Sequence, residues 1–218
     1  MAKNPTLLHW LIAGISFVPA AAAAGEIHGT LTVPGAAAKF SVASAGKSRG
    51  SKFQLNPVTD AVVYVVEIPD KFEKRLAKNA AVARMGQAFG VFIPRTLFVA
   101  AGTTVEFENQ DRVYHNAFSV SPVRRFDLHK YAPRESRRVT FDRPGAVQVF
   151  CDIDPNETGF IFVTPNHAFA RPEANGDFTL PKLPKGKYKV RVWHPRFGSI
   201  SKDVDVPGHG DVSVALRL

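Results

Sequence analysis

Short runs in which apolar and polar residues alternate, each ended by turn-forming residues, recur along most of this chain. Val105 and Phe107, for example, alternate with Glu106 and Glu108. The same alternation is found in residues 27–33, 187–192 and 212–218. Because successive side chains of a strand point to opposite faces of a sheet, this period of two predicts half-buried β-strands. The pattern excludes a mainly helical architecture.

Turn chemistry separates these runs and supports the same fold class. Asn175-Gly176 predicts a two-residue hairpin, and Pro184-Lys185-Gly186 predicts a further turn. Ala61 to Ile68 is rich in β-branched residues, which favours a strand covered on both faces. One helix is predicted, within Phe72–Ala83. The sequence therefore predicts an all-β protein built of β-sandwiches.

The first 24 residues have the form of an export signal. Lys3 precedes an apolar stretch from Leu7 to Val18, Pro19 ends it, and small residues follow as far as Ala24. We expect residues 1–24 to be a signal peptide and the protein to be periplasmic or secreted. An uncleaved anchor is the alternative, and no later segment is long and apolar enough to span a membrane.

Charge and cysteine content narrow the possible partners. Cys151 is the single cysteine, which excludes an intrachain disulfide framework and a cysteine-rich metal finger. The net charge of +9 suits nucleic acid, but predicted export argues against such a partner. The basic residues are densest from Arg124 to Arg143. This segment is interpreted either as a solvated loop face or as a docking surface for an acidic redox partner.

The two ends of the chain resemble the two halves of one small domain. Gly29 to Val33 and Asp60 to Val65 resemble the opening strands of a carboxypeptidase-regulatory-like (transthyretin-like) β-sandwich, and Asn175 to Val192 resembles its later half. The resemblance implies a discontinuous domain of residues 26–70 and 166–218. Residues 86–165 would then be a second sandwich inserted into it, with a tandem order as the alternative.

The middle segment resembles the cupredoxins, the small blue copper proteins, and most of all the plastocyanin-like and amicyanin-like methylamine-utilisation proteins. The resemblance is carried by Phe92-Ile-Pro94, Val99 to Gly102, Val105 to Phe107, Asn109, Tyr114-His-Asn-Ala-Phe118 and Cys151-Asp-Ile-Asp-Pro-Asn-Glu157. It implies a Greek-key β-sandwich that carries electrons by means of bound copper. Its implied first ligands are His115 and Cys151. Val147, Val149 and Cys151 share strand parity, so we expect the thiol to face the interior.

The loop after the cysteine departs from that family. In the amicyanin-like loop a histidine follows the cysteine by three positions and a methionine by six, whereas this chain has Asp154 and Glu157 there. We expect His115, Cys151, Asp154 and Glu157 to form an altered copper site, since hard oxygen donors favour Cu(II), or Zn(II), over Cu(I). The alternative is a metal-free interaction or scaffold protein that has lost its copper.

The remaining candidates are weaker. His129 and His167 are considered as substitute ligands, although a surface position is the simpler interpretation of each. His28 offers no case beyond solvent exposure. A Cys151–His115 nucleophile pair is the enzymatic alternative, but Asp152, Asp154 and Glu157 would disfavour its thiolate. The protein is therefore not predicted to be an enzyme.

Overall fold

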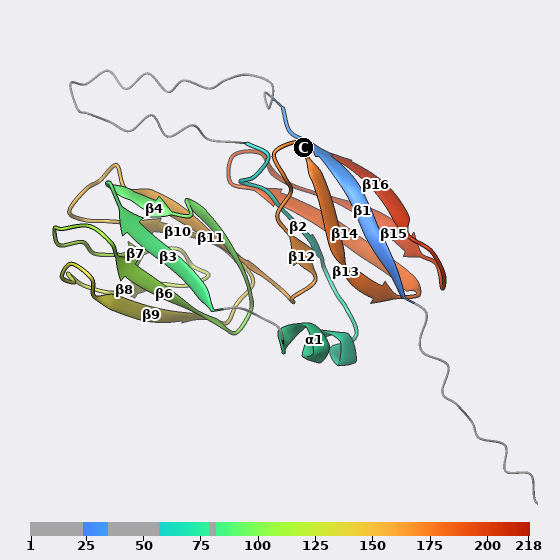
Figure 1. Cartoon of the computed structure of the whole chain (residues 1–218), viewed down its shortest axis with the longest axis horizontal. Coiled ribbons are helices and arrows are strands. Elements are labelled where there is room, and N and C mark those ends of the chain that lie inside the picture. The colour runs from blue at the N-terminus through green and yellow to red at the C-terminus, as the bar shows by residue number, and fades with distance from the viewer. Residues whose placement is uncertain (1–23, 35–56, 79–81) are drawn as a thin grey trace, which may run out of the picture.

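The computed structural model describes residues 24–34, 57–78 and 82–218, and within them the chain is almost entirely β (Figure 1). Sixteen strands form four sheets, and one short helix accompanies them. The sheets enclose two separate apolar cores, so the described chain forms two β-sandwiches. The predicted all-β fold class is confirmed. The predicted signal peptide, apart from Ala24, lies outside the described residues.

The first sandwich pairs a three-stranded sheet, in the order β13-β1-β16, with a four-stranded sheet, in the order β12-β2-β14-β15. Its strands are β1 (Ala24–Thr32), β2 (Val62–Val65), β12 (Phe169–Ala170), β13 (Asp177–Pro184), β14 (Gly186–His194), β15 (Gly198–Val206) and β16 (Val212–Arg217). Alternation places Ile27 of β1 and Val190 of β14 in the shared core. The strands predicted within residues 27–33, 61–68, 187–192 and 212–218 are confirmed in β1, β2, β14 and β16.

The second sandwich is made only of β3 to β11. A five-stranded sheet, β5-β11-β10-β7-β8, packs on a four-stranded sheet, β4-β3-β6-β9. The strands are β3 (Ala83–Ala88), β4 (Val91–Ile93), β5 (Thr96–Ala100), β6 (Thr103–Asn109), β7 (Phe118–Ser119), β8 (Phe126–Asp127), β9 (Ser136–Phe141), β10 (Gly145–Phe150) and β11 (Thr158–Thr164). Phe107 from one sheet and Val147 from the other meet in its core.

The chain leaves the first sandwich after β2 and returns to it at β12. A third apolar cluster, which includes Tyr64, Phe98 and Phe162, joins the two sandwiches. Phe162 stacks on Trp193 with ring centroids 4.3 Å apart. All four residues of β2 are buried because Val63 and Val65 face the first core while Val62 and Tyr64 face this junction. The predicted domain bounds, a discontinuous domain of residues 26–70 and 166–218 with residues 86–165 inserted, stay a prediction.

The helix α1 spans Asp70–Ala77. It begins before the predicted Phe72, directly after Pro69, with Asp70 and Glu73 in the first turn and Arg75 in the last. This charge order suits the helix dipole. Residues 79–81 of the predicted span lie outside the described residues. No helix in the described part of the chain is long and apolar enough to cross a membrane.

The turn at Asn175-Gly176 is present, but it does not join neighbouring strands. β13, which follows it, pairs with β1 instead of β12. The Gly176 carbonyl accepts a hydrogen bond from the Leu31 N–H at 2.8 Å, which holds the turn against β1. Gly176 has φ of +96°, and a Cβ there would lie 2.3 Å from the Leu31 oxygen. Contact with a distant strand therefore decides what this turn connects.

Candidate metal centre

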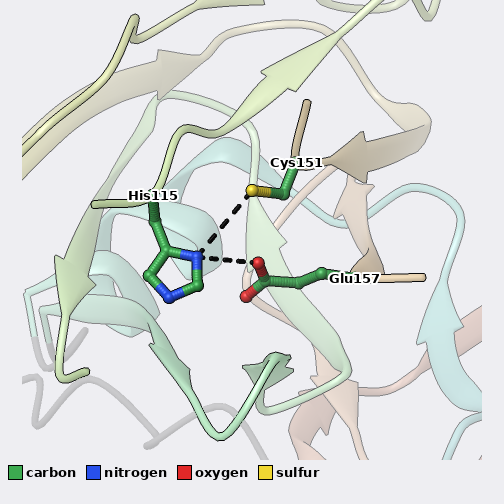
Figure 2. A group of neighbouring side chains, drawn as sticks. All are labelled: His115, Cys151 and Glu157. Carbon is green, nitrogen blue, oxygen red and sulfur yellow. Dashed lines mark hydrogen bonds and ion pairs between the residues drawn. The ribbon is translucent and has the colours of Figure 1, made fainter. Parts of the chain in front are cut away.

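Three side chains of the second sandwich converge beneath one end of its sheets. His115 lies between β6 and β7, Cys151 directly follows β10, and Glu157 directly precedes β11. Figure 2 shows the imidazole, the thiol and the carboxylate pointing toward one another. The Nδ1 of His115 lies 3.8 Å from Cys151 Sγ and 3.0 Å from Glu157 Oε2. The three donor atoms all lie within 4.8 Å of one another.

The strand β10 aims the thiol inward. Val147 and Val149 are fully buried, and Cys151, two residues further on, is only 2% exposed. This agrees with the predicted parity of these three positions. The backbone of His115 is held by an isolated β-bridge to Tyr131, in which the Tyr131 N–H donates to the His115 carbonyl at 2.9 Å. The cysteine and the histidine therefore meet although 36 positions separate them.

A tight loop returns Glu157 to the cysteine. The Cys151 N–H donates to the Glu157 carbonyl at 3.2 Å, and the Glu157 N–H donates to the Asp154 carbonyl at 2.9 Å. This double closure places the side chain six positions after the cysteine inside the protein. Glu157 is fully buried.

Asp154 does not join this group, in contrast to the four-residue set expected from the sequence. Its Oδ1 accepts hydrogen bonds from the backbone and side-chain nitrogens of Asn156, at 3.0 and 3.2 Å. The side chain is half-buried and outside the converging donors. The reason is the turn at 154–157, in which Asp154 caps the loop backbone. Three of the four predicted ligands come together here.

Asp111 is a site residue that sequence reasoning missed. Its Oδ2 lies 3.0 Å from His115 Nε2, and its Oδ1 accepts the Phe89 N–H at 3.0 Å. Partial burial alone would raise the pKa of Asp111, but the Phe89 N–H, the His115 ring and the Gly90 N–H hold it below its usual value. A charged acceptor at Nε2 assigns the proton of a neutral ring to that nitrogen. The lone pair of Nδ1 then faces Cys151 and Glu157. The only sequence signal was an aspartate four positions before the histidine.

The Glu157 carboxylate has no hydrogen-bond partner within the described protein. Both of its oxygens are buried, and neither accepts a hydrogen bond, although Nδ1 of His115 is at ion-pair distance. Burial raises the pKa of Glu157, and the neighbouring His115, Cys151 and Gln87 side chains oppose that rise only in part. An unpartnered buried carboxylate is costly by several kcal/mol unless it is protonated or meets a cation.

The thiol environment argues against a nucleophilic cysteine. Burial raises the pKa of Cys151, the N–H groups of Asn116, Asp154 and Ile153 oppose this, and the Glu157 charge raises the pKa further. A reactive thiol needs a lowered pKa and access to solvent. A metal ion, in contrast, supplies the positive charge that deprotonates a buried thiol.

A buried hydrogen-bonded chain supports the site from behind. Tyr131 donates its hydroxyl to Gln87 Oε1, and Gln87 Nε2 donates to the Asn116 carbonyl at 3.1 Å. Asn116 in turn accepts the Asp152 N–H on its Oδ1 at 3.0 Å. Burial raises the pKa of Tyr131, as do the charges of Glu157 and Cys151. This chain connects the loops that carry the histidine and the cysteine.

The substitute histidines considered from the sequence lie elsewhere. His167 is bound to the helix, where its Nδ1 lies 2.6 Å from Glu73 Oε1. His129 is exposed, with its Nδ1 3.5 Å from Asp127 Oδ2. Neither belongs to the converging group. Within the described residues, the centre therefore consists of one imidazole, one thiol and one carboxylate.

These three donors fit a transition-metal ion. An imidazole nitrogen with a fixed free lone pair, a thiol and an unpartnered carboxylate are ligands that Cu and Zn accept. The orphaned Glu157 oxygens are what a cation would satisfy.

Comparisons with known proteins find partial likeness only. No protein-family model matches the sequence, and no curated protein matches it. Among solved structures, a Cu-containing nitrite reductase (NirK) from Thermus scotoductus SA-01 is 29% identical, with a TM-score of 0.37 over 39% of this chain. A purple cupredoxin from Nitrosopumilus maritimus is 22% identical, with a TM-score of 0.35 over 38% of this chain. A reduced amicyanin mutant is 23% identical, with a TM-score of 0.35 over 40% of this chain.

The matched segment has a different extent in each of these proteins. It spans 23% of the nitrite reductase chain, 99% of the purple cupredoxin and 88% of the amicyanin. The first of these proteins is described as Cu-containing and the second as a cupredoxin, and a likeness of this extent assigns no family to this chain. The carboxypeptidase-regulatory-like resemblance of the first sandwich stays a prediction.

Proposed function

We propose that this protein is an exported metal-binding protein of the electron-transfer type, with copper held by His115, Cys151 and Glu157. The site is altered from that of blue copper proteins, because Asp154 and Glu157 stand where the resembled family has its second histidine and its methionine. One observation carries the proposal. A fully buried carboxyl group whose oxygens make no hydrogen bond of ordinary geometry lies 3.0 Å from an imidazole nitrogen and beside a buried thiol.

The donor set decides which chemistry the site favours. Bound copper would supply a one-electron couple between Cu(II) and Cu(I). Cys151 and His115 are donors that suit both oxidation states, whereas the hard oxygen of Glu157 favours Cu(II). We therefore expect a lower reduction potential than a site with a thioether in that position would have.

The protein itself keeps the ligands in place. Asp111 holds the ring of His115 from its far side, and the loop closed by Cys151 and Glu157 fixes both of their backbones. Each of the three ligands is at most 3% exposed. Such burial limits solvent access to the site, which suits an electron carrier.

Copper loading of the purified chain tests this proposal. The wild-type protein should retain one equivalent of copper after desalting and show a thiolate-to-copper absorption band. Cys151→Ser should lose the band, and Glu157→Gln should lose retention. Asp154→Asn should keep both, because its side chain points away from the donors; loss of copper in that variant would restore Asp154 as a ligand.

Other outcomes assign other functions. Retention of zinc but not copper, with the zinc lost in Cys151→Ser, would make this a redox-inactive centre. If neither metal is retained while circular dichroism shows an intact fold, the metal-free scaffold replaces the present proposal.

We further propose that a redox partner docks near the segment Arg124–Arg143. Arg125, Lys130 and Arg134 are exposed, and no ion pair joins them to an acidic group within the described part of the chain. Beside Asp111, the apolar Phe89 and Val113 are 83% and 59% exposed. Association with an acidic electron-transfer protein should weaken with salt and in Arg125→Glu. Association that is independent of salt would argue against this surface.

A further inference from the structure

A second group of metal-ligand side chains lies on the first sandwich, away from the centre described above. Glu26 and His28 are two residues apart on β1, so both side chains stand on the same face of the strand. Asp211 reaches them from the segment between β15 and β16. The Nε2 of His28 lies 3.2 Å from Glu26 Oε2 and 3.7 Å from Asp211 Oδ2. These three atoms lie within 4.8 Å of one another.

Each of these side chains uses its second polar atom for a contact that orients it. The Nδ1 of His28 is 3.0 Å from the Thr179 hydroxyl, and Asp211 Oδ1 accepts the Glu26 N–H at 3.0 Å. The Oε1 of Glu26 lies 3.6 Å from Lys182 Nζ. The atoms that remain, Nε2, Oε2 and Oδ2, are the ones that face one another. Outer contacts of this kind are what fixes the ligands of protein metal sites.

The spacing of these atoms matches a tetrahedral ion. Nitrogen and oxygen ligands about 2.0–2.2 Å from Zn²⁺ lie about 3.3–3.6 Å apart. The observed 3.2 and 3.7 Å bracket that range. The geometry points to a second metal site, in which His28, Glu26 and Asp211 bind a divalent ion of the zinc type and water completes the tetrahedron.

The donor types decide which ions the site would accept. One imidazole and two carboxylates, without sulfur, favour Zn²⁺ and similar divalent ions over Cu⁺. Side-chain exposures of 45% for His28 and 58% for Asp211 leave the site open to an ion from solvent. The competing interpretation is a protonated His28 that pairs with both carboxylates and binds no ion.

Zinc binding by the full chain tests this site independently of the copper proposal. Native mass spectrometry and calorimetry with Zn²⁺ should find one equivalent bound at this site. That equivalent should persist in Cys151→Ser. His28→Ala should remove it, and Asp211→Asn should weaken it about tenfold or more. Asp211→Asn keeps an oxygen that can accept the Glu26 N–H, so its fold should be intact.

His129→Ala is the matched control, because His129 is an exposed histidine beside a single carboxylate. It should leave zinc binding unchanged. The proposal is overturned if excess Zn²⁺ leaves the NMR resonances of the His28 ring unshifted. It is also overturned if His28→Ala and His129→Ala bind zinc equally well. Loss of copper in Cys151→Ser has no bearing on either result.

Discussion

Asp111 and Cys151 lie on opposite sides of the His115 ring, with Asp111 Oδ2 3.0 Å from Nε2 and Cys151 Sγ 3.8 Å from Nδ1. The Asp111 carboxylate stabilises the ring tautomer whose proton is on Nε2. The nitrogen left with a lone pair is the one that faces the thiol and Glu157.

Removing the Asp111 carboxylate should weaken the binding of copper. Asp111→Ala should lower copper affinity about 10–100-fold, because the ring loses the partner that fixes its tautomer and orientation. Asp111→Asn should be less severe, since its amide oxygen can still accept the Nε2 proton. Competition with a chelator of known affinity measures the change. Asp142→Asn, at an exposed turn, is the control, and equal affinities in Asp111→Ala and Asp142→Asn would contradict the assigned role.

Glu157→Gln should have opposite effects in the presence and absence of metal. Without metal, a neutral amide replaces a buried carboxyl that lacks a partner, and the free energy of unfolding should rise by about 1–2 kcal/mol. With copper, the wild type should be stabilised and the variant should not, because binding to the native state alone adds stability. Denaturant unfolding with and without copper measures both. A loss of stability in the metal-free variant would mean that Glu157 has a partner that this structure does not show.

His194 should make stability depend on pH. Its Nδ1 accepts the Arg196 and Phe197 N–H groups at 3.0 and 3.3 Å, and burial lowers its pKa below the usual 6.5, although Asp60 opposes this. As pH falls below about 6.5, the unfolded chain binds the proton more readily, so folding stability declines until the folded pKa is passed. Comparing unfolding midpoints across this range for His194→Gln tests the effect. The variant should lose that part of the slope, while the exposed His129→Gln should keep it.

The junction between the sandwiches should control whether they unfold together. Trp193→Ala removes the ring stacked on Phe162 and should lower the free energy of unfolding by about 2 kcal/mol. It should also separate the transitions of the two sandwiches in calorimetry. Phe150→Ala, whose ring meets Phe118 within the second sandwich, should destabilise without that separation. A single unchanged transition in Trp193→Ala would argue against independent folding units.

The strands and the inward thiol were predictable from the sequence because both depend on local periodicity. Alternation over a few residues fixes which side chains face a core, as for Ile27 in β1 and for Val149 and Cys151 at the end of β10. The position of the helix was also predictable, although its ends were not, because they depend on Pro69 and the charges beside it.

Which of the predicted ligands come together was decided only by the tertiary structure. Asp154 and Glu157 are equally plausible in the sequence, but closure of one loop turns Glu157 inward and Asp154 toward Asn156. The grouping of His28, Glu26 and Asp211 was likewise hidden, since the contact that joins Glu26 to Asp211 spans 185 positions. Periodicity describes each strand by itself, whereas a site requires atoms from several segments, and those segments meet only when the sandwich that carries them has folded.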